Sequence, residues 1–391
     1  MKTLIELYDE RPIENVLASE VFHPETTVFL CPPEVAQDKR LQEKLKKYFV
    51  SRGLDTKLVF LESSLYYSNK VLKQLLKVVE SYADCALDIT GGTDAALFAC
   101  GQLCAETDIP AFTYGRRKNR FFNIHNATFA DNLPCTVAHN VEDCFRLTGG
   151  SLREGRVDNA ILNGYMGKFE PFFKLYLRHR TKWTGIVKYI QQASRTEKGQ
   201  PIPLHVEADY ILKGDRGTKL CAPEACLRDL EKLGFLTALR LSADGVSFTF
   251  VDHQIRTWLR DIGSVLELYV YKACLDLGIF NDVRTSAVVD WEGGENQNDV
   301  TNEIDVMAMQ GILPAFISCK TCEVSTEALN ELAILRDRFG GESAKAAVVT
   351  AKHCNAITRH RAAELNIDVI DLDDLKAGRI REHIRAMMRQ D

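Results

Sequence analysis

The sequence predicts an α/β protein of three consecutive parts, and two observations lead to this fold class. Within residues 1–145, and again within 256–391, short runs of β-branched and apolar residues alternate with longer segments of helical spacing. Such alternation is typical of a mostly parallel, Rossmann-like sheet covered by helices. Residues 146–255 interrupt the pattern, and a chain of 391 residues is long enough for two or three domains.

In the first part, strand-like runs alternate with helix-like segments. We expect strands at 3–7, 27–30, 56–60, 85–89 and 111–114, and helices ending at Lys47 and spanning 69–82 and 95–106. Val71, Leu75 and Val78 give the helix over 69–82 its apolar stripe. Because ligands lie beyond the carboxyl ends of strands in such sheets, the turns that follow these strands are candidate binding sites.

The middle and last parts differ from each other in pattern. In the middle part we expect a helix at 223–233 and strands around Leu239 and at 246–251, which flank the turn signal Ala243-Asp244-Gly245. A helix followed by such a hairpin resembles a winged helix. The last part resumes the alternation, with helices at 255–277, 326–339 and 357–365 and strands near Val283 and at 302–309, 315–320, 346–350 and 367–371.

Composition and charge exclude several classes of protein. The hydrophobic content of 46% and charged content of 26% are ordinary for a globular protein, and a net charge of -5 argues against a uniformly basic coat protein for nucleic acid. The first residues are charged where a signal peptide needs an apolar core, and no run approaches the ~18 apolar residues of a membrane span, so we expect a cytoplasmic protein without a membrane partner. The twelve cysteines are scattered, which favours buried thiols over disulfides.

A Thr90-Gly91-Gly92-Thr93 turn joins the fourth expected strand to the helix expected at 95–106. Two glycines allow the close approach of a ligand, and the free amides of a helix N-terminus favour a phosphate. The segment Asp9-Glu10-Arg11-Pro12-Ile13-Glu14-Asn15 follows the first strand at the same edge of the sheet. Pro12 is suited to start a helix, and Asn15 to hydrogen-bond a ribose or base. Both segments are equally explained as capped turns without a ligand.

Three segments of the last part carry residues suited to phosphodiester hydrolysis. Glu267 lies on the expected helix, Asp305 on the strand at 302–309, and Lys320 on the next strand, where Ser318 shares its face. The spacing between Asp305 and Lys320 fits a β-hairpin that brings them together. Carboxylates bind hard cations such as Mg²⁺, and a lysine stabilises charge on a phosphate. Without a function, Asp305 and Lys320 would be an ion pair, which is costly when buried.

Together these motifs resemble the CRISPR ancillary nucleases that join a CARF (CRISPR-associated Rossmann fold) domain to a PD-(D/E)xK nuclease domain. The resemblance covers nearly the whole chain. It rests on the order of D-E-R-P-I-E-N at 9–15, T-G-G-T at 90–93, G-S-V-L-E at 263–267, N-E-I-D-V at 302–306, I-S-C-K-T at 317–321 and R-x-x-A-x-x-L-x-I at 359–367. It implies a CARF domain at 1–145, a linker and winged-helix-like region at 146–255, and a nuclease domain at 256–391.

The resemblance also implies a function. It implies a homodimer whose paired CARF domains bind a cyclic oligoadenylate, usually cyclic tetra-adenylate, and so switch on cleavage of DNA or RNA in type III CRISPR defence. The cofactor would be a divalent metal, Mn²⁺ or Mg²⁺. The ligand pocket would include Pro12, Asn15 and the turn with its next residue, Thr90, Gly91, Gly92, Thr93 and Asp94. The nuclease site would include Glu267, Asp305 and Lys320.

Two positions depart from the family pattern. The family often has lysine after T-G-G-T, whereas Asp94 places a negative charge there. The carboxylate that the family has two residues before the lysine is replaced by Ser318, and a hydroxyl is a weaker metal ligand. Some restriction enzymes of the superfamily carry S-x-K and take the acid from the following helix, where Glu327 and Glu331 share a face. Glu303 is a third candidate for the metal shell.

Two alternatives to the activated nuclease stay open. If no other acid completes the metal shell, the chain is a ligand-sensing regulator that binds nucleic acid and keeps an inactive nuclease fold. A general repair or restriction nuclease with an unrelated nucleotide sensor is the other alternative.

Residues 168–198 form a basic stretch, with eight Lys or Arg and two Glu interleaved with aromatic residues. The aromatic side chains are suited to a helix core. The basic ones are suited either to solvent or to a track for nucleic acid. The candidates for this track are Lys174, Arg178, Arg180 and Lys182. Similarly, the basic residues at 116–120 either form a solvated hairpin tip or face an anionic ligand.

Overall fold

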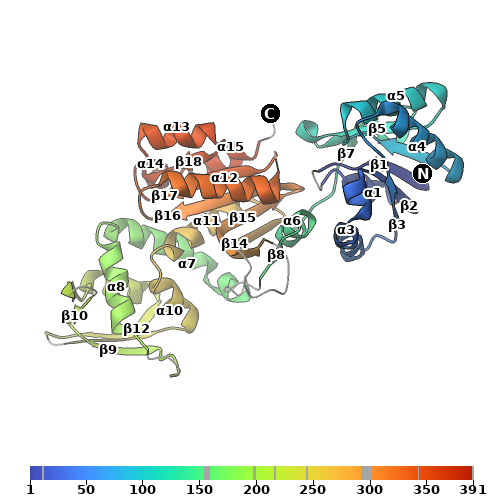
Figure 1. The fold of residues 1–391 in the computed structure, drawn as a ribbon. Helices are drawn as coiled ribbons and strands as arrows, with labels where there is room; N and C mark the ends of the chain where they lie inside the picture. Colours follow the sequence, from blue (N-terminus) through green and yellow to red (C-terminus); the bar gives the residue numbers. More distant parts are fainter. Residues whose placement is uncertain are drawn as a thin grey trace.

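The computed structural model describes residues 1–10, 13–153, 159–196, 200–214, 217–243, 245–291, 301–341 and 343–389. Pro12 and Asp244, which the sequence singled out, lie outside these residues. Figure 1 shows an N-terminal domain at one end of the molecule, a second sheet with its helices in the centre, and the middle part of the sequence at the other end. The expected α/β fold class is confirmed.

The N-terminal domain is a doubly wound sheet of seven strands in the order β3-β2-β1-β4-β5-β6-β7. The first five in this order are parallel, and the last two add an antiparallel edge. The strands are β1 (Thr3–Leu7), β2 (Thr26–Cys31), β3 (Lys57–Glu62), β4 (Cys85–Asp88), β5 (Ala111–Gly115), β6 (Arg120–His125) and β7 (Leu133–Pro134). The helices are α1 (Leu17–Phe22), α2 (Pro33–Gln37), α3 (Lys39–Ser51), α4 (Ser68–Ser81) and α5 (Asp94–Glu106). Strand order reverses between β1 and β4, so their carboxyl ends form the topological switch point, where such folds bind ligands.

The C-terminal domain is a six-stranded sheet in the order β18-β17-β16-β15-β14-β8. Helices α11 and α12 cover opposite faces, because α11 packs with Val306 and Ala308 whereas α12 packs with Met307 and Met309. The strands are β8 (Ser151–Leu152), β14 (Asp282–Asp290), β15 (Thr301–Gln310), β16 (Leu313–Lys320), β17 (Lys345–Thr350) and β18 (Asp368–Ile370). The helices are α11 (Ser264–Leu277), α12 (Thr326–Gly340), α13 (Ala356–Glu364), α14 (Leu372–Lys376) and α15 (Ile380–Met387).

The helix expected at 255–277 is two helices, α10 (His253–Leu259) and α11. The expectation of one helix was wrong because Asp261 interrupts it. Its carboxylate accepts hydrogen bonds from the amides of Gly263 and Ser264, each at 2.7 Å, and so fixes a turn directly before the new helix. The break places Glu267 in the first turn of α11.

The middle part contains helices and two small sheets. Its helices besides α10 are α7 (Asn159–His179), α8 (Trp183–Ala193) and α9 (Glu224–Leu233). Its strands are β9 (His205–Asp209), β10 (Ile211–Lys213), β11 (Lys219–Cys221), β12 (Leu236–Leu241) and β13 (Gly245–Phe250). The expected helix and hairpin are present, and β9 joins the hairpin as a third strand. The winged-helix interpretation stays a prediction. Within the described residues, no helix is both long and apolar enough to cross a membrane.

Two short elements before the middle part pack onto the C-terminal sheet. Helix α6 (Val141–Thr148) contributes Cys144 and Phe145 to the core that α12 covers, and β8 pairs with β14. Helix α6 runs across the expected domain boundary at 145. The expected boundaries stay a prediction.

The connection between the two α/β domains is buried around His139. Its Nε2 lies 2.9 Å from a Glu20 carboxylate oxygen and 2.8 Å from the Tyr48 hydroxyl, both in the N-terminal domain. Its backbone N–H donates to the Gly311 carbonyl, and its carbonyl accepts from the Asn281 amide, both in the C-terminal domain. The two domains therefore share a hydrogen-bonded core at this residue.

Candidate ligand turn and nuclease site

The Thr90–Thr93 turn lies at the switch point, directly against the end of β1. A Cβ on Gly91 would lie 2.8 Å from the Cβ of Asp9, and a Cβ on Gly92 would lie 2.7 Å from a methyl carbon of Leu7. Gly92 also has a positive φ of 94°. Both positions therefore require glycine, for close packing and, at Gly92, for backbone conformation as well.

Both threonines of the turn contact neighbouring elements. The Thr90 hydroxyl accepts a hydrogen bond from the Tyr114 amide of β5 at 2.7 Å and bonds to the Asp88 carboxylate. The Thr93 hydroxyl donates to the Leu65 carbonyl in the loop after β3, and accepts from Ala96 as the N-cap of α5. The turn is therefore hydrogen-bonded to β5 on one side and to the loop after β3 on the other, and it ends at the free amides of the α5 N-terminus.

Asn15 is buried rather than open to a ligand in this structure. Its side chain accepts from the Asp9 amide at 2.9 Å and donates to the Asp9 carbonyl at 2.8 Å. Asp9 in turn accepts from the Gly92 amide at 3.3 Å. Asn15 thus positions the loop after β1 against the turn, and its contact with a ligand stays a prediction, as does that of Asp94 in the first turn of α5.

Three buried carboxyl groups lie beneath this edge of the sheet, and the sequence analysis missed them. Glu6 and Asp88 are register neighbours on β1 and β4. Burial raises the pKa of Asp88 to about 7 despite its hydrogen bonds with Thr90, and burial together with Asp88 and Glu14 raises the pKa of Glu6 well above its usual value. Glu14 is paired with Arg116, which follows β5. The available signal was a glutamate inside an apolar strand.

The nuclease candidates Asp305, Ser318 and Lys320 meet where β15 and β16 part. One Asp305 carboxylate oxygen accepts from the Cys319 amide at 2.6 Å and from the Ser318 hydroxyl at 3.2 Å, and lies 3.9 Å from the Lys320 ammonium. The Asp305 side chain is 18% exposed and that of Lys320 33% exposed. The expected hairpin thus brings acid and lysine together at a partly open site.

Glu267 approaches the same site from the first turn of α11. Burial, together with the negative charges of Asp305, Asp261 and Glu303, raises its pKa to about 8 against the opposing effect of Lys320. Burial also raises the pKa of Asp305 against the effects of its hydrogen bonds and of Lys320. Asp261 was not foreseen, because its proximity depends on the helix break. Several carboxyl groups therefore converge beside one lysine.

The three further candidates for the metal shell differ in their surroundings. Glu303 is close enough to raise the pKa of both Glu267 and Asp305. Glu331 instead accepts a hydrogen bond from Asn302 at 2.7 Å, and Asn302 accepts one from Trp291. Glu327 is exposed near the N-terminus of α12, and hydrogen bonds with its own backbone and with Ser325 lower its pKa. The described contacts join neither helix glutamate to Asp305.

The donor set at the nuclease site fits a hard divalent cation. Carboxylate oxygens are the ligands such ions prefer, and the mutual repulsion of Glu267 and Asp305 is of the kind that a bound cation offsets. Elsewhere in the described chain, His353, Asp371 and Asp373 place ligand atoms within 4.8 Å of one another. Asp371 is already the N-cap of α14 and pairs with Arg359 at 2.6 Å, so hydrogen bonding accounts for its position there.

In the basic stretch at 168–198, the large aromatic side chains are buried and most of the candidate basic side chains are exposed. Its large aromatic side chains are buried in the core of the middle part: Phe169, Phe172, Phe173, Tyr176, Trp183 and Tyr189. Lys174, Arg178 and Lys182 are exposed and Arg180 is half-buried. Lys174 pairs with Glu170 and Arg178 with Asp229. The aromatic core is confirmed, and the track for nucleic acid stays a prediction.

Comparisons with known proteins agree with this architecture. Residues 255–390 match the family described as Card1-like, endonuclease domain. The fold is similar to that of protein VC1899 from Vibrio cholerae, at 16% identity over 99% of this chain and 98% of that one, with a TM-score of 0.78. It is also similar to Can2 from Sulfobacillus thermosulfidooxidans in complex with cyclic tetra-adenylate, at 17% identity over 99% and 97% of the chains, with a TM-score of 0.70. A comparison with curated proteins gives no match.

The fold and the family match together define the class: a Rossmann-like domain joined to a domain similar to the Card1-like endonuclease domain. The matches confirm the resemblance to CRISPR ancillary proteins that join a CARF domain to a nuclease domain, and the C-terminal part is similar to the Card1-like endonuclease domain over 255–390.

Proposed function

We propose that the chain is a metal-dependent nuclease that a cyclic oligoadenylate activates in type III CRISPR defence. The observation that carries the proposal is the convergence of Glu267, Asp305 and Lys320 within the segment similar to Card1-like endonuclease domains. Phosphodiester hydrolysis needs this combination of hard-metal ligands and a cation beside the phosphate.

In the nuclease site, Glu267 and Asp305 hold the metal, and Glu303 is the best-placed third carboxylate. A divalent metal bound there would supply the activation of a water molecule and the neutralisation of charge on the phosphate. Lys320 stabilises the developing charge on the phosphate, and the Ser318 hydroxyl and Cys319 amide keep the Asp305 carboxylate in position. The exposed basic residues of α7 and the segment after it bind the nucleic acid, which is DNA or RNA.

In the sensor domain, the turn at the switch point binds the activator. The turn ends at the N-terminus of α5, whose amides suit a phosphate, and Can2, which has the same fold, was solved with cyclic tetra-adenylate. A homodimer with a two-fold axis matches a ring of the same symmetry. Cyclic tetra-adenylate is therefore the first activator to test.

One observation favours a second function, a nucleic-acid-binding regulator with an inactive nuclease domain. Ser318 provides a hydroxyl where the family has a carboxylate, and that hydroxyl is hydrogen-bonded to Asp305. A site with only two metal-binding carboxylates beside a lysine would bind the metal weakly.

The test is to incubate the purified chain with supercoiled plasmid or with RNA, with and without cyclic tetra-adenylate, in Mn²⁺, Mg²⁺ or a chelator. We expect cleavage that requires both the metal and the activator. Cleavage that survives the chelator would rule out the metal site. Binding of activator and nucleic acid without cleavage in either metal would favour the regulator.

A further inference from the structure

The loop between β3 and α4 carries two tyrosines that the fold leaves in solvent. Tyr66 is 76% exposed and Tyr67 is 59% exposed, whereas most large aromatic residues of the chain are buried. Two adjacent exposed rings offer flat aromatic surface on which a planar ligand group can stack. Neither ring contributes to the hydrophobic core of the domain.

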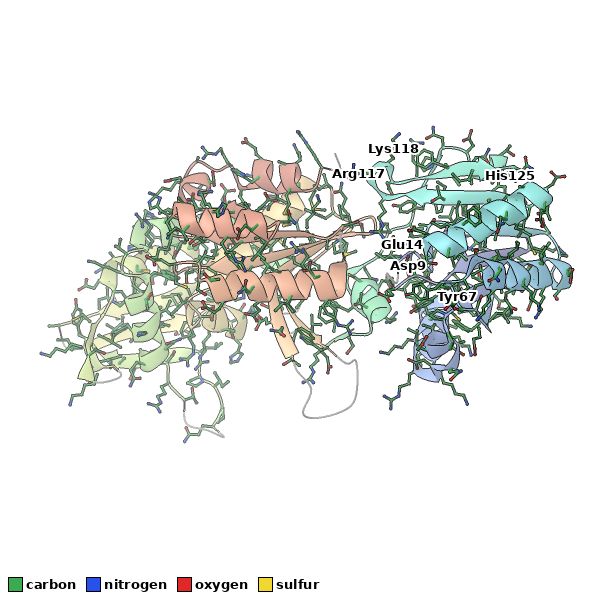
Figure 2. The ribbon with its side chains drawn as sticks, turned by 45° about the horizontal axis from the view of Figure 1, so that its top comes forward. Asp9, Glu14, Tyr67, Arg117, Lys118 and His125 are labelled. Carbon is green, nitrogen blue, oxygen red and sulfur yellow. The ribbon has the colours of Figure 1, made fainter. Side chains whose placement is uncertain are left out.

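This loop contacts the Thr90–Thr93 turn directly. The Leu65 carbonyl, one residue before the tyrosines, accepts the hydrogen bond of the Thr93 hydroxyl. Helices α4 and α5, which start at the loop and at the turn, pack in one core through Val71 and Ala96. Figure 2 shows Tyr67 at the same end of the N-terminal domain as Asp9 and Glu14.

The two sides of the turn differ in chemistry. On the β5 side, Arg117 and Lys118 are exposed, and in Figure 2 they lie on the opposite side of Asp9 from Tyr67. On the β3 side lie the tyrosine rings, with the Lys70 ammonium 4.7 Å from the centre of the Tyr67 ring. The Ser63 hydroxyl at the start of this loop is buried and has no hydrogen-bond partner among the described residues. Phosphate-binding groups thus lie on one side of the turn, and flat aromatic surface with an unused hydroxyl on the other.

We propose that Tyr66 and Tyr67 form a stacking platform for adenine bases of the activator. The inference rests on the proposed function and deepens it, because it assigns the base-recognising side of the sensor site. Adenine presents a flat π-face that stacks on aromatic side chains, while its phosphates are attracted to the α5 amides and to Arg117 and Lys118. The loop after β3 therefore selects for the purine base, and the turn binds the backbone of the ring.

The experiment measures the affinity of cyclic tetra-adenylate by calorimetry for the full chain and for Tyr66→Ala, Tyr67→Ala and Tyr67→Phe. Val50→Ala, at an exposed apolar residue on α3, is the matched control. We expect each alanine variant to weaken binding by roughly 5- to 150-fold, the range for loss of one stacked base. Tyr67→Phe keeps the ring and should stay within about twofold of the wild type. Sedimentation of each variant reports its oligomeric state.

Each contrary outcome has a separate meaning. If the wild type does not bind cyclic tetra-adenylate, the proposed function fails, and the platform fails with it. If the wild type binds and both alanine variants bind equally well, only the platform is refuted. If the alanine variants lose affinity and also change oligomeric state, the tyrosines are a contact between two copies of the chain, which overturns the platform as well.

Discussion

Asp305 lies at the centre of the proposed nuclease site. A backbone amide, a hydroxyl and an ammonium all approach one of its carboxylate oxygens. The sequence could predict this meeting, because strand spacing alone brings residues 305 and 320 together across a hairpin. It could not predict that Asp261 lies near the site, because that depends on the break between α10 and α11. Nor could it predict that Glu331 bonds to Asn302 instead of joining Asp305.

Asp305→Asn should abolish cleavage, because it removes a charged metal ligand and leaves the hydrogen bond from Cys319 in place. Lys320→Ala should lower the cleavage rate by about 10²-fold or more while Mn²⁺ affinity stays the same or rises, because the lysine acts on the phosphate and repels the metal. Cleavage rates and calorimetric Mn²⁺ binding check both. Lys352→Ala, an exposed lysine after the next strand, is the control. Equal loss of metal affinity in both variants would contradict these roles.

The identity of the third carboxylate is a separate question. Glu303→Gln should weaken Mn²⁺ binding and slow cleavage, because Glu303 is electrostatically coupled to both Glu267 and Asp305. Glu331→Gln and Glu327→Gln should leave both quantities near the wild-type values, and they serve as matched controls. If all three variants cleave normally, no third carboxylate exists. If only Ser318→Glu shows cleavage, the natural chain is a regulator.

At the scale of elements, the strand–turn–helix unit of β4, Thr90–Thr93 and α5 forms the proposed ligand site. The spacing of apolar residues and the residue types of the turn were enough to predict each of its elements. They were not enough for the helix at 255–277, because the turn that the Asp261 carboxylate forms with the Gly263 amide is local and competes with a continuous apolar stripe. They also gave no sign that Asn15 is buried, since its hydrogen bonds depend on how the loop after β1 folds back.

Gly91→Ala should weaken binding of cyclic tetra-adenylate by more than about tenfold and lower the melting temperature, because its Cβ would collide with Asp9 and displace the loop after β1. Gly101→Ala is the control within α5, where a new Cβ meets no atom within 4 Å. That variant should gain roughly 0.5–1 kcal/mol of stability from helix propensity. An unchanged affinity in Gly91→Ala would exclude the turn from the ligand site.

At the scale of the whole molecule, the network around His139 couples the two α/β domains. Burial alone would raise the pKa of Glu20, but the hydrogen bonds and charges of His139, Tyr48 and Arg52 lower it overall. A carboxyl group whose pKa is lower in the folded than in the unfolded chain stabilises the fold at pH values above its ordinary pKa of 4.5. This stabilisation is lost as the pH falls through the pKa of the folded state.

We therefore expect the melting temperature of the wild type to fall steeply on acidification below about pH 4.5. Glu20→Gln should be less stable than the wild type at pH 7, by about 1–3 kcal/mol, and should show a shallower fall at acidic pH. Circular dichroism melts from pH 3 to 7 measure both. Glu62→Gln, on the exposed end of β3, is the control. Parallel pH curves for wild type and Glu20→Gln would show that this carboxylate is not the source of the acid sensitivity.

The two-residue strand β8 has a consequence for how the chain reaches its native state. Ser151 and Leu152 pair with Asp290 and Val289 of β14, far later in the sequence, and Arg153 adds an ion pair with Asp290. The whole middle part is thus an insertion between the edge strand of the C-terminal sheet and the rest of that sheet. During synthesis the N-terminal domain can fold as it leaves the ribosome, whereas β8 cannot pair until β14 has been synthesised. Expression of the segment from residue 255 onward alone would leave Val289 and Asp290 of β14 without their partner strand, and exposed strand edges of this kind are prone to aggregation.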